Sequence, residues 1–477
     1  KMGCGFLETP PRKEGTMQHP TQKNETSKKV ASAVAAVSSF LTPFMGAAIN
    51  IALPAIQREF AMNALLLGWV SASFLLSSAM FLVPFGRIAD IYGRKRIFLT
   101  GITLFALFSL LSALAGSTLT LLAARLLQGV GAAMIFGTGV AILTSVYPPQ
   151  ERGKALGINV AAVYTGLSLG PVLGGILVHQ FGWRSIFLAV TLLSAGAVIL
   201  ALGKLKGEWA EARDEKFDLP GAFIYALSLP ALMYGFSALP AVAGMLFIAA
   251  GVLGLILFVR WELRAQSPLL NMALFRKNTV FTFSNLAALI NYSATFAVGF
   301  LLSLYLQYLK GLTAQAAGAT LVWQPAVMAL CSPFAGRLSD RTEPRIVASV
   351  GMLLTTCGLL LLAFLSAATP FWAIIAVLIL LGLGFALFSS PNTNAVMSAV
   401  EKRYYGVASG TLGTMRLTGQ MFSMGITMLV FALYIGKAQI TPAYYAPFLA
   451  AVKSAFLIFA VLCAGGIFAS LARGKMR

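Results

Sequence analysis

The stretch that decides the fold is Gly86-Arg87-Ile88-Ala89-Asp90-Ile91-Tyr92-Gly93-Arg94-Lys95-Arg96, a loop rich in glycine and charge between two apolar runs. A related stretch, Gly336-Arg337-Leu338-Ser339-Asp340, recurs in the second half of the chain. Matches at a nearly constant offset indicate two duplicated halves, because chance rarely repeats a spacing. The glycines that recur at this offset are Gly129 with Gly382, Gly131 with Gly384, Gly153 with Gly406, Gly157 with Gly410, and Gly166 with Gly419.

The composition around these loops is that of a membrane protein. Of the 477 residues, 58% are hydrophobic and 10% are charged, against about 45–50% and about 25% in an ordinary soluble domain. Apolar runs of about 20 residues, the length that crosses a bilayer as a helix, recur from Val30 almost to the C-terminus. The composition therefore excludes an ordinary soluble enzyme and predicts an all-α membrane protein.

When charged loops and proline or glycine residues are taken as helix boundaries, the apolar runs predict fourteen membrane-spanning helices. They form two six-helix bundles, with two additional helices between them. The expected spans are 30–56, 65–85, 97–115, 119–146, 155–178, 184–203, 219–238, 242–262, 280–307, 315–335, 345–366, 371–397, 404–434 and 448–470.

The expected domain organisation follows from these spans. We expect a disordered cytoplasmic tail over 1–29, an N-terminal bundle over 30–203, and cytoplasmic loops with two extra helices over 204–279. A C-terminal bundle over 280–470 and a cytoplasmic tail over 471–477 complete the chain.

The net charge is +20, from 35 Lys and Arg against 15 Asp and Glu, and the distribution of the cations along the chain indicates the membrane topology. With both termini on one side, the loop cations gather on that side, which the positive-inside rule identifies as the cytoplasm of a cell-membrane protein. The basic residues do not form a basic helix face or a platform of basic and aromatic side chains, so no nucleic-acid partner is expected. The loop cations on the opposite side are Arg58, Arg184, Lys310, Lys437 and Lys453.

Residues 86–96 resemble the signature loop of the major facilitator superfamily, and residues 336–345 repeat it. Positive-inside cations alone would explain the basic residues, but not the acid Asp90 at the edge of the hydrocarbon. The resemblance implies a cytoplasmic latch between the halves, with Asp90 facing the positive N-terminus of the helix that starts near Tyr404. Ile91 departs from the family's usual Arg or Lys, which implies a smaller charge network. The expected latch residues are Gly86, Asp90, Gly93, Arg94, Gly336, Arg337 and Asp340.

Arg125-Leu126-Leu127-Gln128-Gly129 lies deep in the expected fourth helix and resembles the family's Arg-x-x-Gln-Gly motif. An arginine there costs about 2.5–3.5 kcal/mol on insertion scales, so it is a functional-site hypothesis by default. The resemblance implies that Arg125 couples proton movement or keeps a cavity polar; the alternative is an arginine satisfied by carbonyls. Arg416 is the other arginine inside a span. Residues that line the same cavity, or bond between helices, would be Gln128, Asn50, Tyr164, Asn285, Asn291, Gln324, Asn392, Asn394 and Gln420.

Gly166-Leu167-Ser168-Leu169-Gly170-Pro171-Val172-Leu173-Gly174-Gly175 lies in the expected fifth helix. Small residues four apart let helices approach closely, so a packing seam is one interpretation. The Gly-Pro-x-x-Gly-Gly pattern also resembles the motif of the superfamily's antiporters, which implies export. Together with fourteen spans, it narrows the resemblance to the fourteen-spanner drug:proton antiporters. The motif residues are Gly166, Gly170, Pro171, Gly174 and Gly175.

The acidic residues all fall in tails, loops or helix edges. Family members that export cationic drugs usually have an acid in the first helix, near the position of Met45. Without one, a desolvated cationic substrate would lack a counter-charge. We therefore expect neutral amphiphiles or organic anions as substrates. A proton relay would have to use Asp90, Glu262, a tyrosine or the substrate's own acid group, because arginine does not titrate.

The sequence thus predicts a monomeric secondary exporter of amphiphilic small molecules in the lipid bilayer, coupled to protons and working by alternating access. One alternative is an exporter or flippase of an anionic metabolite or lipid-like substrate with altered or absent proton coupling. Another is a membrane scaffold or receptor that does not transport. The scattered cysteines and two histidines predict no metal and no cofactor, and no set of reactive side chains indicates an enzyme.

Overall fold

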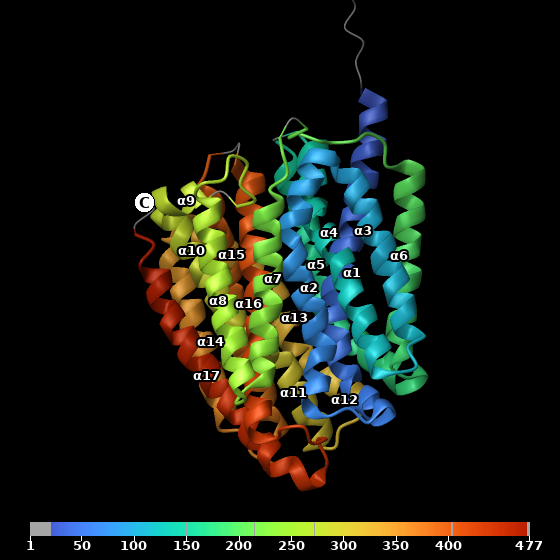
Figure 1. The fold of residues 1–477 in the computed structure, drawn as a ribbon, viewed down its shortest axis with the longest axis vertical. Coiled ribbons are helices and arrows are strands. Elements are labelled where there is room, and N and C mark those ends of the chain that lie inside the picture. The colour runs from blue at the N-terminus through green and yellow to red at the C-terminus, as the bar shows by residue number, and fades with distance from the viewer. Residues whose placement is uncertain (1–20, 149, 214, 271, 402–403, 475–477) are drawn as a thin grey trace, which may run out of the picture.

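The protein is a bundle of long helices that run alongside one another (Figure 1). The computed structural model describes residues 21–148, 150–213, 215–270, 272–401 and 404–474, and its regular elements in these ranges are all helical. This confirms the expected all-α fold. Residues 1–20 of the expected N-terminal tail and 475–477 of the C-terminal tail lie outside the described residues. Residues 21–29, expected to be a disordered tail, are instead helical.

The chain order gives two sets of helices with a pair between them. The N-terminal half contains α1 (Thr21–Phe60), α2 (Ala64–Tyr92), α3 (Arg94–Ala113), α4 (Thr118–Val146), α5 (Arg152–Phe181) and α6 (Arg184–Lys204). The pair is α7 (Leu219–Ala238) and α8 (Val242–Glu262), followed by the short α9 (Met272–Lys277). The C-terminal half contains α10 (Thr279–Thr295), α11 (Ala297–Tyr308), α12 (Ala314–Leu321), α13 (Trp323–Arg341), α14 (Pro344–Ala363), α15 (Phe371–Ser398), α16 (Tyr405–Tyr434), η2 (Pro442–Tyr444) and α17 (Tyr445–Leu471).

Thirteen helices in the described part of the chain are long and apolar enough to cross a membrane. One of them is the span expected over 280–307, which α10 and α11 form together. The span expected over 315–335 is not among the thirteen, because a break at Val322 divides it into α12 and the more polar α13. Length and composition therefore identify one span fewer than the fourteen expected.

Polar side chains determine where several helices begin. Asn63, Asp218, Asn278 and Thr313 each accept a hydrogen bond from a backbone N–H in the first turn of the helix that follows. Ser117 and Thr120 form a reciprocal capping box at the start of α4. These caps satisfy backbone donors that hydrocarbon could not, at the starts of α2, α4, α7, α10 and α12.

The two halves pack in the same pattern, as the duplication in the sequence predicts. In the N-terminal half, α4 packs against α2 and α3, α5 against α1, and α6 against α1 and α3. In the C-terminal half, α15 packs against α13 and α14, α16 against α10, and α17 against α10 and α14. Each contact in one half therefore has a counterpart in the other.

The repeated glycines occupy equivalent close approaches in the two halves. A Cβ at Gly131 in α4 would lie 2.7 Å from the carbonyl oxygen of Gly101 in α3, and one at Gly384 in α15 would lie 2.8 Å from that of Gly351 in α14. Neither position has room for a side chain. The repeated glycines are thus explained by backbone-to-backbone packing of helices.

The additional pair α7 and α8 lies against the seam between the halves. α7 packs on α2 of the first half and on α16 of the second (Figure 1). The hydroxyl of Tyr225 in α7 donates to the carbonyl oxygen of Ala79 in α2 at 3.2 Å. Asp218 at the start of α7 accepts from the Trp261 indole N–H at the end of α8 at 2.9 Å, which joins the two helices of the pair. The contacts of α7 with α2 and α16 attach the pair to both halves.

The glycine seam gives a stability prediction. Gly129→Ala should destabilise the protein by about 1–3 kcal/mol, because its Cβ would collide with Ser77 and with the carbonyl of Phe74 in α2. Gly139→Ala, in the same helix, is the matched control, since no atom lies within 4 Å of its Cβ. Thermal unfolding in one detergent compares the two variants. Equal midpoints would contradict the packing role.

Candidate functional site

Five described hydrogen bonds join α1–α6 to the second half at one end of the molecule, which we name the closed end. It is opposite the end where α1 begins (Figure 1). The closed-end bonds run from Ser303 Oγ to the Asn50 carbonyl (2.7 Å), Gln307 Nε2 to the Ile51 carbonyl (3.1 Å), Tyr308 to the Gln57 side chain, Ala64 N to the Ala438 carbonyl (3.0 Å), and Gln439 Nε2 to the Ala61 carbonyl (2.8 Å). We name the opposite end the tail end.

The glycine motif of α5 contacts both halves near the closed end. Gly170 and Gly174 pack on α1, where their Cβ atoms would lie 2.6 Å from that of Ala47 and 2.8 Å from that of Ala48. Gly175 instead faces α12, and its Cβ would lie 2.7 Å from the carbonyl oxygen of Ala314. The motif, Gly166 and Pro171 included, is therefore a packing seam, as one interpretation of the sequence expected.

Arg125 is enclosed within the N-terminal half. Its side chain is 0% exposed; Nε donates to the carbonyl of Val70 at 3.1 Å and Nη1 donates to Gln128 Oε1. Gln128 in turn donates to Ser109 Oγ at 2.6 Å. The guanidinium carbon lies 4.5 Å from the centre of the Phe74 ring. These contacts agree with the alternative of an arginine satisfied by its own bundle.

Arg416 has a different environment. Its Nη2 donates to Thr393 Oγ1 at 2.8 Å, and its guanidinium carbon lies 5.6 Å from the centre of the Tyr292 ring. Its Nε is buried without a partner. Tyr292 also lies near Ser389 of α15 and within electrostatic range of Tyr164 of α5. Tyr292 therefore lies between Arg416 of its own half and Tyr164 of the other half.

Tyr292, Ser389 and Thr393 complete this cluster and were not expected from the sequence. They adjoin or nearly adjoin expected residues, since Tyr292 follows Asn291 and Thr393 follows Asn392. The adjacent amides were expected instead. They could be identified only from their position opposite Arg416. That position depends on how α10, α15 and α16 pack against one another.

The expected cavity amides are distributed over several environments. Asn50 Oδ1 accepts from Ser71 at 3.2 Å, and Asn285 donates to the carbonyl of Phe281 at 2.9 Å. Asn291 is buried with neither side-chain atom bonded, and Asn392 is buried with Oδ1 unbonded. Gln324 and Gln420 are partly exposed. Asn394 bonds between helices, donating to Ser339 at 2.9 Å.

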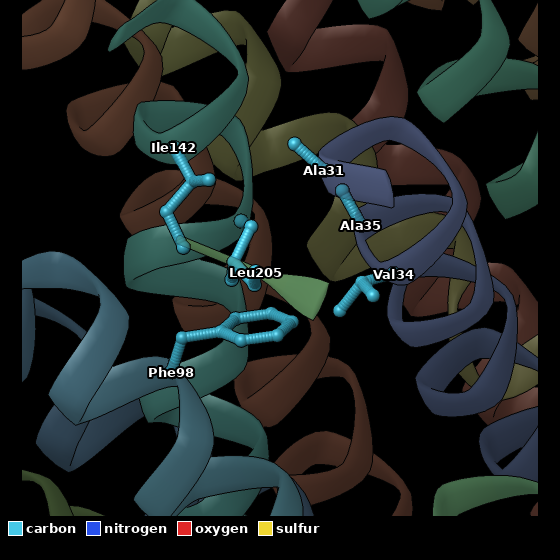
Figure 2. Close-up of a pocket in the computed structure, with 7 residues that line it drawn as sticks. Ala31, Val34, Ala35, Phe98, Ile142 and Leu205 are labelled. Atoms are coloured by element: carbon cyan, nitrogen blue, oxygen red, sulfur yellow. The ribbon is translucent and has the colours of Figure 1, made fainter. Parts of the chain in front are cut away.

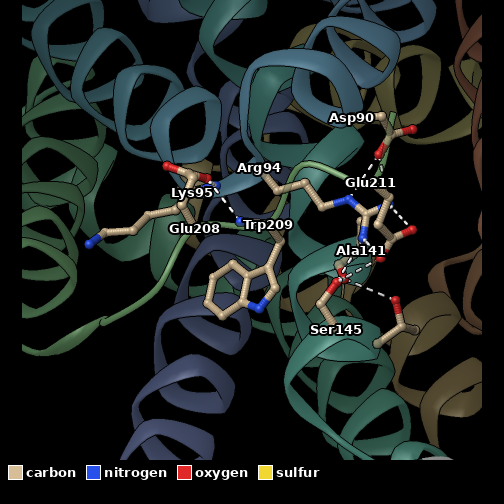
Figure 3. Close-up of polar contacts among 9 residues, drawn as sticks. Asp90, Arg94, Lys95, Ala141, Ser145, Glu208, Trp209 and Glu211 are labelled. Carbon is tan, nitrogen blue, oxygen red and sulfur yellow. Dashed lines mark hydrogen bonds and ion pairs between the residues drawn. The ribbon is translucent and has the colours of Figure 1, made fainter. Parts of the chain in front are cut away.

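The signature loop forms a charge network at the tail end (Figure 3). Arg94 Nε donates to Asp90 Oδ1 at 2.8 Å, and Arg94 Nη1 donates to Ser145 at 2.7 Å. The same guanidinium binds Glu211 in a bidentate pair, at 2.7 and 3.0 Å. Glu211 belongs to residues 205–218, which we name the strap. Gly93, with φ +120°, provides the turn between α2 and α3 that presents Arg94.

The strap makes further contacts with the same loop. The Lys95 N–H donates to Glu208 at 2.8 Å, the Arg94 N–H donates to the Trp209 carbonyl at 2.8 Å, and Arg87 pairs with Glu215. Figure 2 shows the start of the strap, where Leu205 packs in an apolar hollow among α1, α3 and α4. Side chains and backbone therefore both attach the strap to the N-terminal half.

The expected partner of Asp90 was the start of the helix near Tyr404. The described hydrogen bonds and ion pairs of Asp90 instead run to Arg94 and to the Ala212 N–H. In the second half, Gly336, Arg337 and Asp340 lie in the last turns of α13. A latch between the halves through these two loops stays a prediction, since in this structure the strap occupies the first loop.

Arg473 adds a buried cation that the sequence placed among the loop charges. It lies just beyond α17, is 1% exposed, and none of its side-chain nitrogens has a partner in the described structure. Burial lowers the pKa of its guanidinium to about 9. The described residues hold no group of three His, Cys, Asp or Glu side chains placed to bind a metal ion.

The two arginines should differ in their effect on stability. Arg125→Ala should lower the thermal unfolding midpoint, by a free energy of about 2–5 kcal/mol, because it leaves a cavity and unpaired partners in α2 and α4. Arg416→Ala should change the midpoint much less, since one hydrogen bond is lost. Unfolding of both variants in the same detergent compares them. A stable Arg125→Ala protein that has lost transport would favour a coupling role instead.

The strap gives a second prediction. Glu211→Gln should increase the rate at which trypsin cleaves the strap, because it weakens the bidentate pair with Arg94. Limited proteolysis of the full chain, with fragments identified by mass, measures this rate. Glu151→Gln is the control, since Glu151 pairs with Lys28 and does not touch the strap. An unchanged rate would show that backbone contacts alone hold the strap.

Comparison with known proteins places this arrangement in a family. The family model described as Major Facilitator Superfamily matches residues 35–423 and 284–475. The riboflavin transporter RibZ of Clostridioides difficile (strain 630) is 30% identical over 431 residues, covering 90% of this chain and 94% of that protein. The multidrug resistance protein Stp of Mycobacterium tuberculosis (strain CDC 1551 / Oshkosh) is 33% identical over 393 residues, covering 81% and 73%.

A solved structure agrees with the fold. The crystal structure of a bacterial homologue of the human lysosomal transporter Spinster, in an inward-facing and unoccupied conformation, superposes with a TM-score of 0.67 at 15% identity. It covers 95% of this chain and 98% of that one. With duplicated helical halves, membrane-spanning helices and these relatives, the chain belongs to the Major Facilitator Superfamily and is a multi-pass membrane transporter rather than an enzyme.

Proposed function

We propose that this transporter is a secondary active exporter of amphiphilic small molecules that works by alternating access. The observation that supports this most directly is the set of described hydrogen bonds that join the halves at the closed end. At the tail end, the charges of the signature loop bind the strap instead of the other half. Two bundles joined at one end favour a carrier that rocks about a central site.

The names of the relatives support a small organic substrate. RibZ is named for riboflavin and Stp for multidrug resistance. Both names refer to small organic compounds. The glycine motif of α5, which resembles the antiporter motif, favours export as the direction.

We place both termini in the cytoplasm of a fourteen-spanner antiporter. The basic residues of the signature loop and the strap lie at the tail end, as the positive-inside rule requires of a cytoplasmic face. α12 and α13 together supply the remaining span, since they pack beside α5 and α15. The closed end then faces outward, and the structure corresponds to the inward-facing state of the cycle.

Proton coupling is assigned to a carboxyl group because arginine does not titrate. Glu262, at the end of α8, is the best candidate: it is 3% exposed, Oε2 accepts from the Leu270 N–H at 2.9 Å, and Oε1 is buried without a hydrogen-bond partner among the described residues. A carboxyl enclosed by protein changes the local charge when it gains or loses a proton. Asp90 is the second candidate, beside Arg94 in the signature loop.

A second candidate function is export of an anionic metabolite or lipid-like molecule without proton coupling. It is favoured by Arg416, a cation near the interface that forms no ion pair in the described structure. Flux that does not respond to a pH gradient would favour this function.

Transport in liposomes tests the proposal. With the full chain reconstituted and the lumen acidified, riboflavin or another amphiphilic probe should accumulate faster than without a gradient, since outgoing protons drive substrate inward through inverted carriers. Glu262→Gln should remove the response to pH but retain probe exchange, because glutamine carries no titratable proton. Glu151→Gln is the control. Silence with every probe would favour a scaffold, and an undiminished pH response in Glu262→Gln would exclude Glu262 as the carrier.

A further inference from the structure

Five polar side chains, one from the first half and four from the second, lie near one another inside the helix bundle. We name them the tyrosine–arginine cluster. The first half contributes one phenol from α5, and the second half contributes a phenol from α10, two hydroxyls from α15 and a guanidinium from α16. The cluster consists of Tyr164, Tyr292, Ser389, Thr393 and Arg416.

The guanidinium at the centre of this cluster lacks the partners that the other intramembrane arginine has. Arg125 bonds a carbonyl and an amide oxygen and lies over an aromatic ring, all within one bundle. Arg416 makes one described hydrogen bond, to Thr393, and its Nε is buried without a partner. None of the six ion pairs in the described structure includes Arg416.

This state of Arg416 favours an anionic ligand. The Arg416 side chain is partly exposed, but its Nε is buried without a described hydrogen-bond partner, and the face of the Tyr292 ring compensates only part of the lost hydration. A guanidinium presents several N–H donors in one plane, which match the two oxygens of a carboxylate or phosphate. The unbonded Nε leaves such a pair available.

The surroundings of Arg416 indicate what the anion is attached to. The Tyr292 ring packs edge-on against Phe385, with ring centres 5.4 Å apart. Aromatic surface beside a cation suits a ligand with a flat or apolar body and one acidic group. Tyr164 belongs to the α5 helix, whose glycines hold it against α1. A ligand bound at Arg416 would therefore contact both halves.

We propose that the tyrosine–arginine cluster is the anion-binding part of the substrate site, and that it takes the carboxylate or phosphate group of an aromatic amphiphile. This inference rests on the proposed function, because it assigns the substrate class of the same carrier. Arg416 pairs with the acidic group, and Tyr164 and Tyr292 contribute hydroxyls from opposite halves.

Binding of matched pyrene probes tests this assignment. The full chain in lipid nanodiscs is titrated with 1-pyrenebutyrate, 1-pyrenebutyl phosphate and the neutral 1-pyrenebutanol, and the signal of empty nanodiscs is subtracted. Arg416→Gln removes the cation, and Arg416→Lys keeps the charge without the planar donors. Arg260→Gln is the control, because Arg260 is an exposed cation on α8, away from the cluster.

The wild type should bind one or both acids more tightly than the alcohol, and which acid wins distinguishes carboxylate from phosphate. Arg416→Gln should weaken acid binding by about 10- to 100-fold, leave the alcohol unchanged, and differ from Arg260→Gln. Arg416→Lys should be intermediate. Equal binding of acids and alcohol by the wild type, no saturable binding, or an equal loss for all three probes in Arg416→Gln would overturn the assignment.

Folding and function are separated by two further measurements. The thermal midpoint of each variant identifies one that does not fold; if Arg416→Gln fails, Arg416→Lys and Thr393→Ala carry the comparison. Binding needs no pH gradient. Arg416-dependent acid binding without gradient-driven flux would therefore count against the proposed function alone, and gradient-driven flux with acid binding independent of Arg416 would count against this inference alone.

Discussion

Hydrocarbon provides no hydrogen-bond partner, and the rest of this structure depends on how the chain supplies its own. Backbone groups are satisfied inside helices, and the ends of helices are capped by residues such as Asn63, Asp218 and Asn278. A buried side chain must meet the same requirement. Arg125 does so fully within one bundle, whereas Arg416 does so only in part. Arg125 is thus held within one bundle, and the partly unsatisfied Arg416 is the one that we propose for ligand binding.

Close backbone contact is the second means by which the helices associate. Lipid tails are as apolar as leucine, so burying leucine does not hold two helices together in a bilayer, and packing of small residues does. Gly131 and Gly384 provide the same contact in the two halves, and the glycines of α5 hold it against α1 and α12. Such seams tie helices together within each half, and Gly175 also joins α5 to α12 of the other half. The polar bonds between the halves are fewer and gather at the closed end.

The strap changes how the signature loop is understood. In the sequence, Asp90 and Arg94 suggested a partner in the other half, and the acidic residues of 205–218 looked like an ordinary polar connection. In the structure, Glu208, Glu211 and Glu215 bind the basic residues of the loop, and Leu205 anchors the segment in the first bundle (Figures 2 and 3). Loop charges therefore serve more than topology here. A connection between bundles competes for the same cations that a latch would use.

The sequence by itself determined the helical membrane fold, the duplication and the limits of most spans, because apolar length and repeated glycines are local signals. The limits of α7 and α8 agree with the expected ones, whereas the span over 315–335 broke at Val322, just before Pro325, which has no backbone N–H to donate to the carbonyl four residues earlier. Only the tertiary structure decided which polar residues meet. Tyr292 and Thr393 face Arg416 from neighbouring helices, whereas Arg125 points into its own bundle. Both arrangements depend on the rotation of each helix about its axis. A one-dimensional pattern identifies a buried charge, but the partner of that charge is set by neighbours distant in the chain.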